Sequence, residues 1–258
     1  MSTKKILITG STDGIGLETA KKFKSLGHTV LLHGRNSKKL QKVSGELGLD
    51  FFQADLSSFD ETKSFAEAVL KNHDKIDVLI NNAGVFKTSS SKTQEGYDVR
   101  FVVNTFAPYL LTKMLLPALK EGRIINLSSA AQSSVDFEAM LGKAELSDFE
   151  AYAQSKLAIT MWSRYLACTL QKSGPVVISV NPGSLLGTKM VKEGFNTSGN
   201  DINIGVNILV SLSLDEEHGA HSGDYYDNDN QRYSLPQADG SNDKKAKQIV
   251  EEIERIIS

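Results

Sequence analysis

The chain has 258 residues, of which 40% are hydrophobic and 23% are charged, and its formal net charge is −2. This length suits one large α/β domain and is short for two, so we expect a single domain over residues 1–258. The nearly balanced charge gives no reason to expect a nucleic acid or an anionic membrane surface as a partner. The first residues are polar and no later run reaches the roughly 20 apolar residues of a spanning helix, which predicts a cytoplasmic protein without a membrane segment.

The single cysteine and the histidine pair near the C-terminal end have ordinary structural interpretations. Cys168 excludes an internal disulfide and lies in an apolar helical run, so we expect it in the core. His218 and His221 are three residues apart but lack an organised third ligand, so we predict no metal site. The acidic run 224–229 lacks the spacing of a calcium loop.

The opening stretch, residues 4–16, reads KKILITGSTDGIG and predicts a strand, a phosphate loop and a helix start. Gly10 lets the chain turn sharply after the strand, Gly14 leaves room for a phosphate, and Gly16 lets the helix pack closely. Backbone N–H groups at the helix start would face an anion. Because such a turn is also an ordinary structural device, the glycine spacing alone is a weak indication of cofactor binding.

Strand and helix patterns alternate along the rest of the chain. Strands are expected at residues 6–8, 28–33, 50–54, 76–80, 124–127, 176–180 and 224–226. Helices are expected at 15–26, 37–47, a stretch ending near 72, 95–120 with a bend at Pro108, 150–172, 202–212 and 244–257, with a helical turn at 137–143. This alternation predicts a parallel sheet covered by helices on both faces. The polar, glycine-rich loop 184–200 has the composition of a lid.

The motifs at the strand ends resemble those of the short-chain dehydrogenase/reductase family. The pattern TGxxxGxG is matched by Thr9, Gly10, Gly14 and Gly16, and further landmarks follow in order: Asp55, Asn81, Asn82, Ala83, Gly84, Asn104, Ser129, Tyr152, Lys156, Pro182 and Gly183. The long connection between Ser129 and Tyr152 is similar to the retinol-dehydrogenase-like branch. The resemblance implies a seven-stranded, doubly wound Rossmann fold and nicotinamide-dependent carbonyl or alcohol chemistry.

Tyr152 and Lys156 are four residues apart in a predicted helix and therefore share one face. A free tyrosine titrates near pH ~10, so acting as general acid or base near neutrality requires a downward shift of about three units. Lys156 together with the positive nicotinamide ring of a cofactor could supply that shift in a shielded site. The resemblance also implies that Lys156 holds the nicotinamide ribose.

Ser129 and Asn104 complete the predicted catalytic set. Ser129 follows a strand, where its hydroxyl could donate to a substrate oxygen as negative charge develops, and the family pattern favours it over Ser128. Asn104 lies in an apolar helix. It is either a satisfied buried amide or, as the resemblance implies and as we favour, the anchor of a proton-relaying water near the lysine.

The predicted cofactor site extends from the glycine loop to the loop after the strand at 176–180. Its residues are Gly10, Ser11, Thr12, Gly14, Ile15, Gly16, Arg35, Asn36, Asp55, Leu56, Asn82, Ala83, Gly84, Tyr152, Lys156, Pro182, Gly183 and Thr188. The resemblance implies that Asp55 hydrogen-bonds the adenine, although it could merely cap the following helix. Thr188 lies one residue further from Gly183 than the family pattern has it.

The end of the second strand predicts NADP(H) rather than NAD(H). Gly34 stands where NAD-binding folds commonly carry an acidic residue, and Arg35 offers a permanently charged fork that suits a phosphate. Lys38 and Lys39 follow at the next helix start. Asp13 argues against this interpretation, because many NADP-using relatives carry a basic residue there.

The sequence therefore predicts an NADP(H)-dependent reductase that acts on a moderately hydrophobic carbonyl, with Tyr152 as the proton donor. The alternative is a non-catalytic, cofactor-sensing protein on the same fold, a class that commonly loses the tyrosine or the lysine. A sugar-nucleotide epimerase is disfavoured because Asp13 stands where its pattern needs glycine. The expected partner is a small molecule. The resemblance allows a homodimer through the helices of Asn104 and Tyr152, but the long connection between Ser129 and Tyr152 could obstruct that contact.

Overall fold

The computed structural model describes residues 2–171 and 174–258, and within them eight strands form one sheet. The strands are β1 (Lys5–Ile8), β2 (Thr29–Gly34), β3 (Phe51–Gln53), β4 (Val78–Asn81), β5 (Arg123–Leu127), β6 (Val176–Asn181), β7 (Tyr225–Asp227) and β8 (Arg232–Ser234). Their order is β3-β2-β1-β4-β5-β6-β7-β8, and all neighbours are parallel except β7 and β8. The chain reverses direction across the sheet between β1 and β4, the switch point at which such sheets bind ligands.

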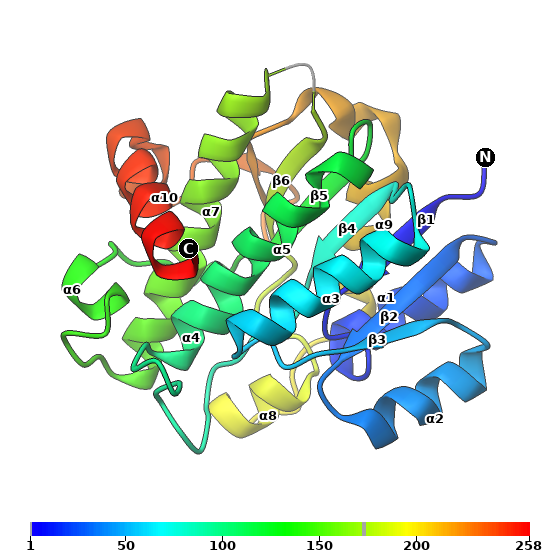
Figure 1. Ribbon diagram of the computed structural model, residues 1–258, viewed down its shortest axis with the longest axis horizontal. Helices are drawn as coiled ribbons and strands as arrows, with labels where there is room; N and C mark the ends of the chain where they lie inside the picture. The colour runs from blue at the N-terminus through cyan, green and yellow to red at the C-terminus, as the bar shows by residue number, and fades with distance from the viewer. Residues whose placement is uncertain (1, 172–173) are drawn as a thin grey trace.

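Helices cover both faces of this sheet, as the alternating pattern predicts. They are α1 (Gly14–Ser25), α2 (Ser37–Leu47), α3 (Phe59–Asn72), α4 (Val99–Phe101), α5 (Ala107–Leu115), α6 (Phe137–Met140), α7 (Asp148–Leu170), α8 (Lys189–Phe195), α9 (Asn203–Leu214) and α10 (Asp243–Ile257). One buried cluster joins the sheet to α1, α2 and α9, and a second joins its other face to α3, α5 and α7 (Figure 1). The doubly wound fold is thus confirmed.

The count of seven strands is wrong by one. The segment after β7 looks polar enough to be a loop, but Gln231 adopts a left-handed backbone (φ 51°) and the chain turns back as the antiparallel strand β8. Tyr233 lies opposite Tyr226 in the register, with ring centroids 5.0 Å apart. This aromatic pair stabilises a strand too short to show a clear alternating pattern.

The helix expected over residues 95–120 begins later and is divided. Asp98 accepts a hydrogen bond from the backbone N–H of Arg100 and so caps α4. A π-helical turn, Val102–Phe106, then separates α4 from α5, and Pro108 lies in the first turn of α5. The irregularity falls just before the residue that lacks a backbone donor. The end predicted for the later helix, at Lys172, lies outside the described residues.

The long helix α7 is covered by the C-terminal helix α10, which lies beside it in Figure 1. Trp162 of α7 belongs to the same buried cluster as Ile249 and Ile253 of α10. The burial predicted for Cys168 is wrong, because this residue is exposed while its neighbour Ala167 faces the sheet. One residue step rotates a side chain about 100° around a helix, which accounts for the difference. Across the described residues, none of the helices is both long and apolar enough to cross a bilayer.

Candidate active site

A cavity of about 420 Å³ opens at the carboxyl ends of β1, β2, β4, β5 and β6. It is lined by most of the residues predicted from the sequence. These are Gly10, Thr12, Gly14, Ile15, Gly16, Arg35, Asp55, Leu56, Asn82, Ala83, Gly84, Tyr152, Lys156, Pro182 and Thr188. The strand ends therefore bring the glycine loop, Arg35 and the Tyr152–Lys156 pair to one space, although they lie far apart along the chain.

The glycine loop is held in shape by Asn82. The Asn82 side chain donates to the backbone oxygens of Thr9 (2.7 Å) and Gly10 (3.0 Å). A Cβ at Gly16 would lie 2.4 Å from both the Gly10 oxygen and the Asn82 amide nitrogen, so only glycine fits there. A Cβ at Gly14 would meet only Thr188, at an ordinary contact distance of 3.6 Å. The space beside Gly14 is therefore open on the cavity side, as binding of a phosphate requires.

Asp13 has two bonds that the sequence did not reveal. Its carboxylate accepts the N–H of Gly14 (2.9 Å), which caps α1, and the Lys39 ammonium of α2 lies 2.9 Å away. The bond from Lys39 holds the pKa of Asp13 below its ordinary value. Asp13 is thus an ionised cap whose charge is paired with a cation. Its expected repulsion of a nearby phosphate is therefore weaker.

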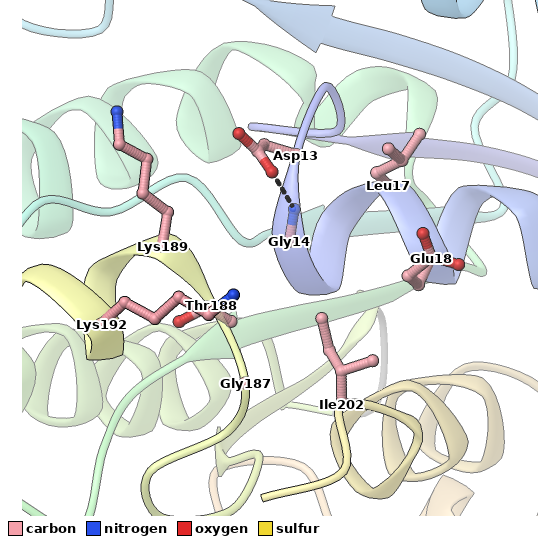
Figure 2. A pocket seen from close by; sticks show the side chains of 9 residues that line it. All are labelled: Asp13, Gly14, Leu17, Glu18, Gly187, Thr188, Lys189, Lys192 and Ile202. Carbon is pink, nitrogen blue, oxygen red and sulfur yellow. Dashed lines mark hydrogen bonds between the residues drawn. The ribbon is translucent and has the colours of Figure 1, made fainter. Parts of the chain in front are cut away.

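The outer side of the glycine loop faces the loop that leads into α8. Figure 2 shows a second hollow there, with Asp13 and Glu18 of the α1 region on one side and Lys189 and Lys192 of α8 on the other. The Thr188 hydroxyl accepts the N–H of Val191 (3.3 Å) and so caps α8. This bond fixes the position of Thr188 at the cavity, and its contact with a nicotinamide amide stays a prediction.

The predicted catalytic pair comes from α7, which begins with a capping box formed by Ser147 and Glu150. The Lys156 side chain is only 4% exposed, and its ammonium donates to the backbone oxygen of Leu127 (2.7 Å). Burial lowers the pKa of Lys156 from 10.5 to about 8, because a buried charge loses its hydration. The ammonium lies 5.7 Å from the centroid of the Tyr152 ring.

Tyr152 and the two serines after β5 have different surroundings. Burial raises the pKa of Tyr152, and a hydrogen bond with the Ser129 hydroxyl opposes part of that rise. The Ser128 hydroxyl donates to the backbone oxygen of Lys156 (2.8 Å). Ser128, and not Ser129, is among the residues that line the cavity, whereas Ser129 interacts with the Tyr152 side chain, so the preference for Ser129 stays a prediction.

Asn104 lies in the π-helical turn, and both the nitrogen and the oxygen of its side-chain amide have hydrogen-bond partners. Its amide nitrogen donates to the Val85 oxygen and to the Ser155 hydroxyl, both at 3.0 Å, and its oxygen accepts the Val85 N–H at 2.8 Å. These bonds match the satisfied buried amide and fix the strand end that carries Gly84. A role for Asn104 in a water relay stays a prediction.

Other predicted residues support the loops without lining the cavity. The Ser11 hydroxyl accepts the N–H of His33 (2.9 Å), Asn36 caps α2, and the Gly183 N–H donates to the Asn181 side chain (3.3 Å). Asp55 does line the cavity, but it is not the helix cap, because Ser58 caps α3. Its carboxylate accepts two hydrogen bonds from Ser57 instead.

The two histidines near β7 do not converge on one ligand. His218 has its ring nitrogens within hydrogen-bond distance of Ser211 (3.0 Å) and Tyr233 (2.8 Å). His221 contacts Asp224 at 2.8 Å. The fold does bring carboxylates of Asp215 and Glu217 close to His218, a grouping that the sequence did not reveal. Since both His218 nitrogens already have partners, we assign no metal there.

Several lining residues lie outside the predicted set of site residues, among them His33, Lys39 and Phe86. His33 is the next-to-last residue of β2. Its Nδ1 accepts the Gly10 N–H (3.1 Å), and its ring stacks on Phe65. Phe86 packs its ring 5.2 Å from that of Tyr152. Phe86 begins the loop 86–94, which the sequence offers as a candidate wall of the substrate site.

The buried His33 predicts a loss of stability in acid. Burial lowers its pKa from 6.5 to about 4, so the unfolded chain takes up a proton near pH 6.5 that the folded chain refuses until about pH 4. The stabilisation is complete above pH 6.5 and is lost as the pH falls through this window, by at most about 3 kcal/mol. Urea unfolding at several pH values should show it.

A variant separates this effect from the titration of carboxylates. In His33→Asn, the amide oxygen can still accept the Gly10 N–H but takes up no proton. The parent should therefore lose unfolding free energy through His33 as the pH falls from 6.5 to 4, whereas the variant should not, and the difference between the two proteins should shrink. Parallel pH profiles for the two proteins would show that His33 is not the group responsible.

Comparison with known proteins gives the family. A family model described as short chain dehydrogenase matches residues 4–199. The chain belongs to the short-chain dehydrogenase family. It is 34% identical to mouse retinol dehydrogenase 13 over 70% of this chain and 58% of that protein, and 36% identical to mouse retinol dehydrogenase 12 over 71% of this chain and 62% of that protein. With human retinol dehydrogenase 13 the identity is 29% over 98% of this chain and 84% of that protein.

The chain thus spans about three fifths of the length of the two mouse relatives. Among solved structures, a putative short chain dehydrogenase from Escherichia coli CFT073, complexed with NADPH, has a TM-score of 0.72 and 26% identity over 88% of this chain and 97% of its own. An uncharacterized protein from Mycobacterium paratuberculosis has a TM-score of 0.82 over 99% of this chain and 93% of its own, with 22% identity. That second likeness concerns the fold alone.

Proposed function

We propose that this short-chain dehydrogenase is an NADP(H)-dependent oxidoreductase that interconverts a carbonyl and an alcohol on a moderately hydrophobic small molecule. The whole chain would act as one dinucleotide-binding and catalytic domain. The observation that carries the proposal is that one cavity holds both the glycine loop with Arg35 and the Tyr152–Lys156 pair. The names of the retinol dehydrogenases and the NADPH in the Escherichia coli neighbour support it.

The residues present fit a nicotinamide dinucleotide. The glycine loop has no side chain at Gly14 and ends at the N-terminus of α1, where backbone N–H groups favour a pyrophosphate. Asp55 and Leu56 line the cavity and follow Ala54, whose N–H donates to the oxygen of Gly34 beside Arg35, whereas the Lys156 ammonium bonds Leu127 at the end of β5. We assign the first group to the adenosine and Lys156 to the nicotinamide ribose. The bound cofactor would supply the hydride.

Tyr152 would supply the proton. Burial raises the pKa of Tyr152, the opposite of the fall expected from the sequence, so that fall would have to come from the positive nicotinamide ring of the bound cofactor. The protonated hydroxyl would donate to a carbonyl oxygen as that oxygen gains negative charge. The Ser129 hydroxyl would donate a hydrogen bond to the same oxygen. With a pKa of about 8, Lys156 is mostly cationic at pH 7 and would stabilise the phenolate left behind.

An apolar wall lies beside Tyr152, although Lys87, Lys189 and Glu193 also line the cavity. Phe86 packs against Tyr152 on one side and stacks on Phe195 of α8 on the other, with ring centroids 5.5 Å apart. Met190 of α8 also lines the cavity. These side chains favour a carbonyl with a hydrophobic body. A panel of aldehydes and ketones, screened by loss of NADPH absorbance, tests the proposed activity, and no turnover across the panel would favour the cofactor-sensing alternative.

The loop 184–200 is expected to close over the bound ligands and to become resistant to protease. Its helix α8 already contributes Met190 and Glu193 to the cavity wall, so a ligand there would hold α8 in place. Trypsin cleavage after the exposed Lys192 should slow when saturating NADP(H) is added. Cleavage after Lys120 serves as the control. This residue is exposed just before β5, at the amino ends of the strands and therefore away from the cavity. An equal cleavage rate at Lys192 with and without cofactor would count against the lid.

A further inference from the structure

A buried arginine lies next to the candidate active site but outside the catalytic set. The Arg100 side chain, on the short helix α4, is only 1% exposed. Arginine is seldom fully buried unless it is paired, because removing its charge from water costs several kcal/mol. The contacts of Arg100 therefore indicate what this buried charge is used for.

The Arg100 guanidinium joins three segments of the chain. Its Nε and Nη2 donate to the two carboxylate oxygens of Asp98, at 2.9 and 2.7 Å. Its Nη1 donates to the backbone oxygen of Phe86 at 3.3 Å and to the carboxylate of Asp148. Asp98 alone would give the charge a bidentate partner, so the bonds of Nη1 to Phe86 and Asp148 are not needed to neutralise it. They connect the Phe86 and Asp148 segments through the guanidinium.

Phe86 and Asp148 belong to the two sides of the substrate space. Phe86 follows β4, and its ring lies 5.2 Å from the ring of Tyr152. Asp148 is the first residue of α7, one helical turn before Tyr152. The other face of Phe86 is closely packed, because a Cβ at Gly194 would lie 2.7 Å from its ring. A shift of either segment would therefore change the gap between Phe86 and the Tyr152 hydroxyl.

We propose that Arg100 is a positioning residue: by bonding the Phe86 carbonyl and Asp148 together, it fixes the apolar wall of the substrate site relative to Tyr152. The inference rests on the proposed function, because it assumes that a carbonyl substrate binds between Phe86 and Tyr152. Arg100 itself is not among the residues that line the cavity. It acts through Phe86 and through the first turn of α7.

The variant that tests this with least risk to folding is Asp148→Asn, since the Asp148 side chain is 50% exposed. It keeps the shape and weakens the bond that ties α7 to the guanidinium. The matched control is Asp243→Asn, which removes the carboxylate that pairs with Arg164 near the other end of α7 (3.0 Å). Arg100→Lys is the second variant, because it keeps the charge but loses the planar fork.

We expect Asp148→Asn and Arg100→Lys to raise KM for the best carbonyl of the panel about fivefold or more and to leave the Kd for NADPH within about twofold, since misplacement affects only the substrate side. Asp243→Asn should change neither. Phe86→Leu should raise KM as well. In the Phe86→Leu background, adding Asp148→Asn should raise KM by less than about a further twofold, because both changes act on one contact. Independent effects of the two changes would overturn the inference.

Amide hydrogen exchange gives a readout that needs no substrate. The N–H groups of residues 85–87 should exchange faster in Asp148→Asn than in the parent, and at the parental rate in Asp243→Asn. Unchanged exchange at these residues would overturn the inference even if the parent enzyme is fully active. If the parent enzyme were inactive but exchange were faster in Asp148→Asn, the proposed function would be contradicted. The connection of Phe86 to α7 through Arg100 would still be supported. Loss of NADPH binding in parallel with KM would show a general structural role and overturn the inference.

Discussion

Tyr152→Phe is expected to lower kcat for carbonyl reduction by about 10²- to 10⁴-fold, the usual contribution of a positioned general acid. The substitution removes only the hydroxyl, so the packing of Phe86 on the ring and the contact with Lys156 remain. Binding of NADPH should be nearly unchanged, because the glycine loop and Arg35 are untouched. Steady-state kinetics with the best carbonyl of the panel, beside a titration with NADPH, measures both quantities.

The control is Tyr165→Phe, on the same helix but in the cluster beneath α10. Its kcat should match that of the parent. If Tyr152→Phe kept near-parental turnover on the true substrate, Tyr152 would not be the proton donor and the proposed mechanism would be wrong. A similar fall in both variants would indicate damage to α7 rather than loss of an acid.

The fold and the centre of the site could be predicted because their determinants are local. Gly10, Gly14 and Gly16 lie within seven consecutive positions, and the landmarks at the strand ends meet because parallel strands share one carboxyl edge. Tyr152 and Lys156 are related by helical periodicity alone. Errors fell where periodicity is weak, as in the three-residue strand β8, or where one step around a helix decides burial, as for Cys168.

The residues that the sequence did not reveal depend on contacts between distant segments. The Asp13–Lys39 pair joins positions 26 residues apart, and Arg100 reaches Asp148 over 48. His33 looks like an ordinary strand residue until Gly10 is placed against its Nδ1. No local pattern distinguishes such side chains from solvated or packed ones, so the tertiary structure is needed to find them.

Arg35→Ala is expected to weaken NADPH binding by about 1.5–3 kcal/mol, the usual value of a hydrogen bond to a charged group, or roughly 10- to 150-fold in Kd. Binding of NADH should be nearly unaffected, because it lacks the phosphate that Arg35 would hold. Arg35 is exposed and lines the cavity beside Lys39 and Asp55, where an adenosine phosphate would lie. Side-by-side titrations of the two cofactors measure the difference.

The structure strengthens the physical case for this phosphate site. Asp13, the carboxylate that could repel a phosphate, caps α1 and is paired with Lys39, so its charge is already compensated. Lys42→Ala is the matched control, since it removes an exposed cation that pairs with Glu46 on the same helix α2 and does not line the cavity. It should leave both affinities as they are. Equal losses for NADPH and NADH in Arg35→Ala, or tighter binding of NADH by the parent, would show that the phosphate is not held here, because only a group that contacts the phosphate can discriminate between the two cofactors.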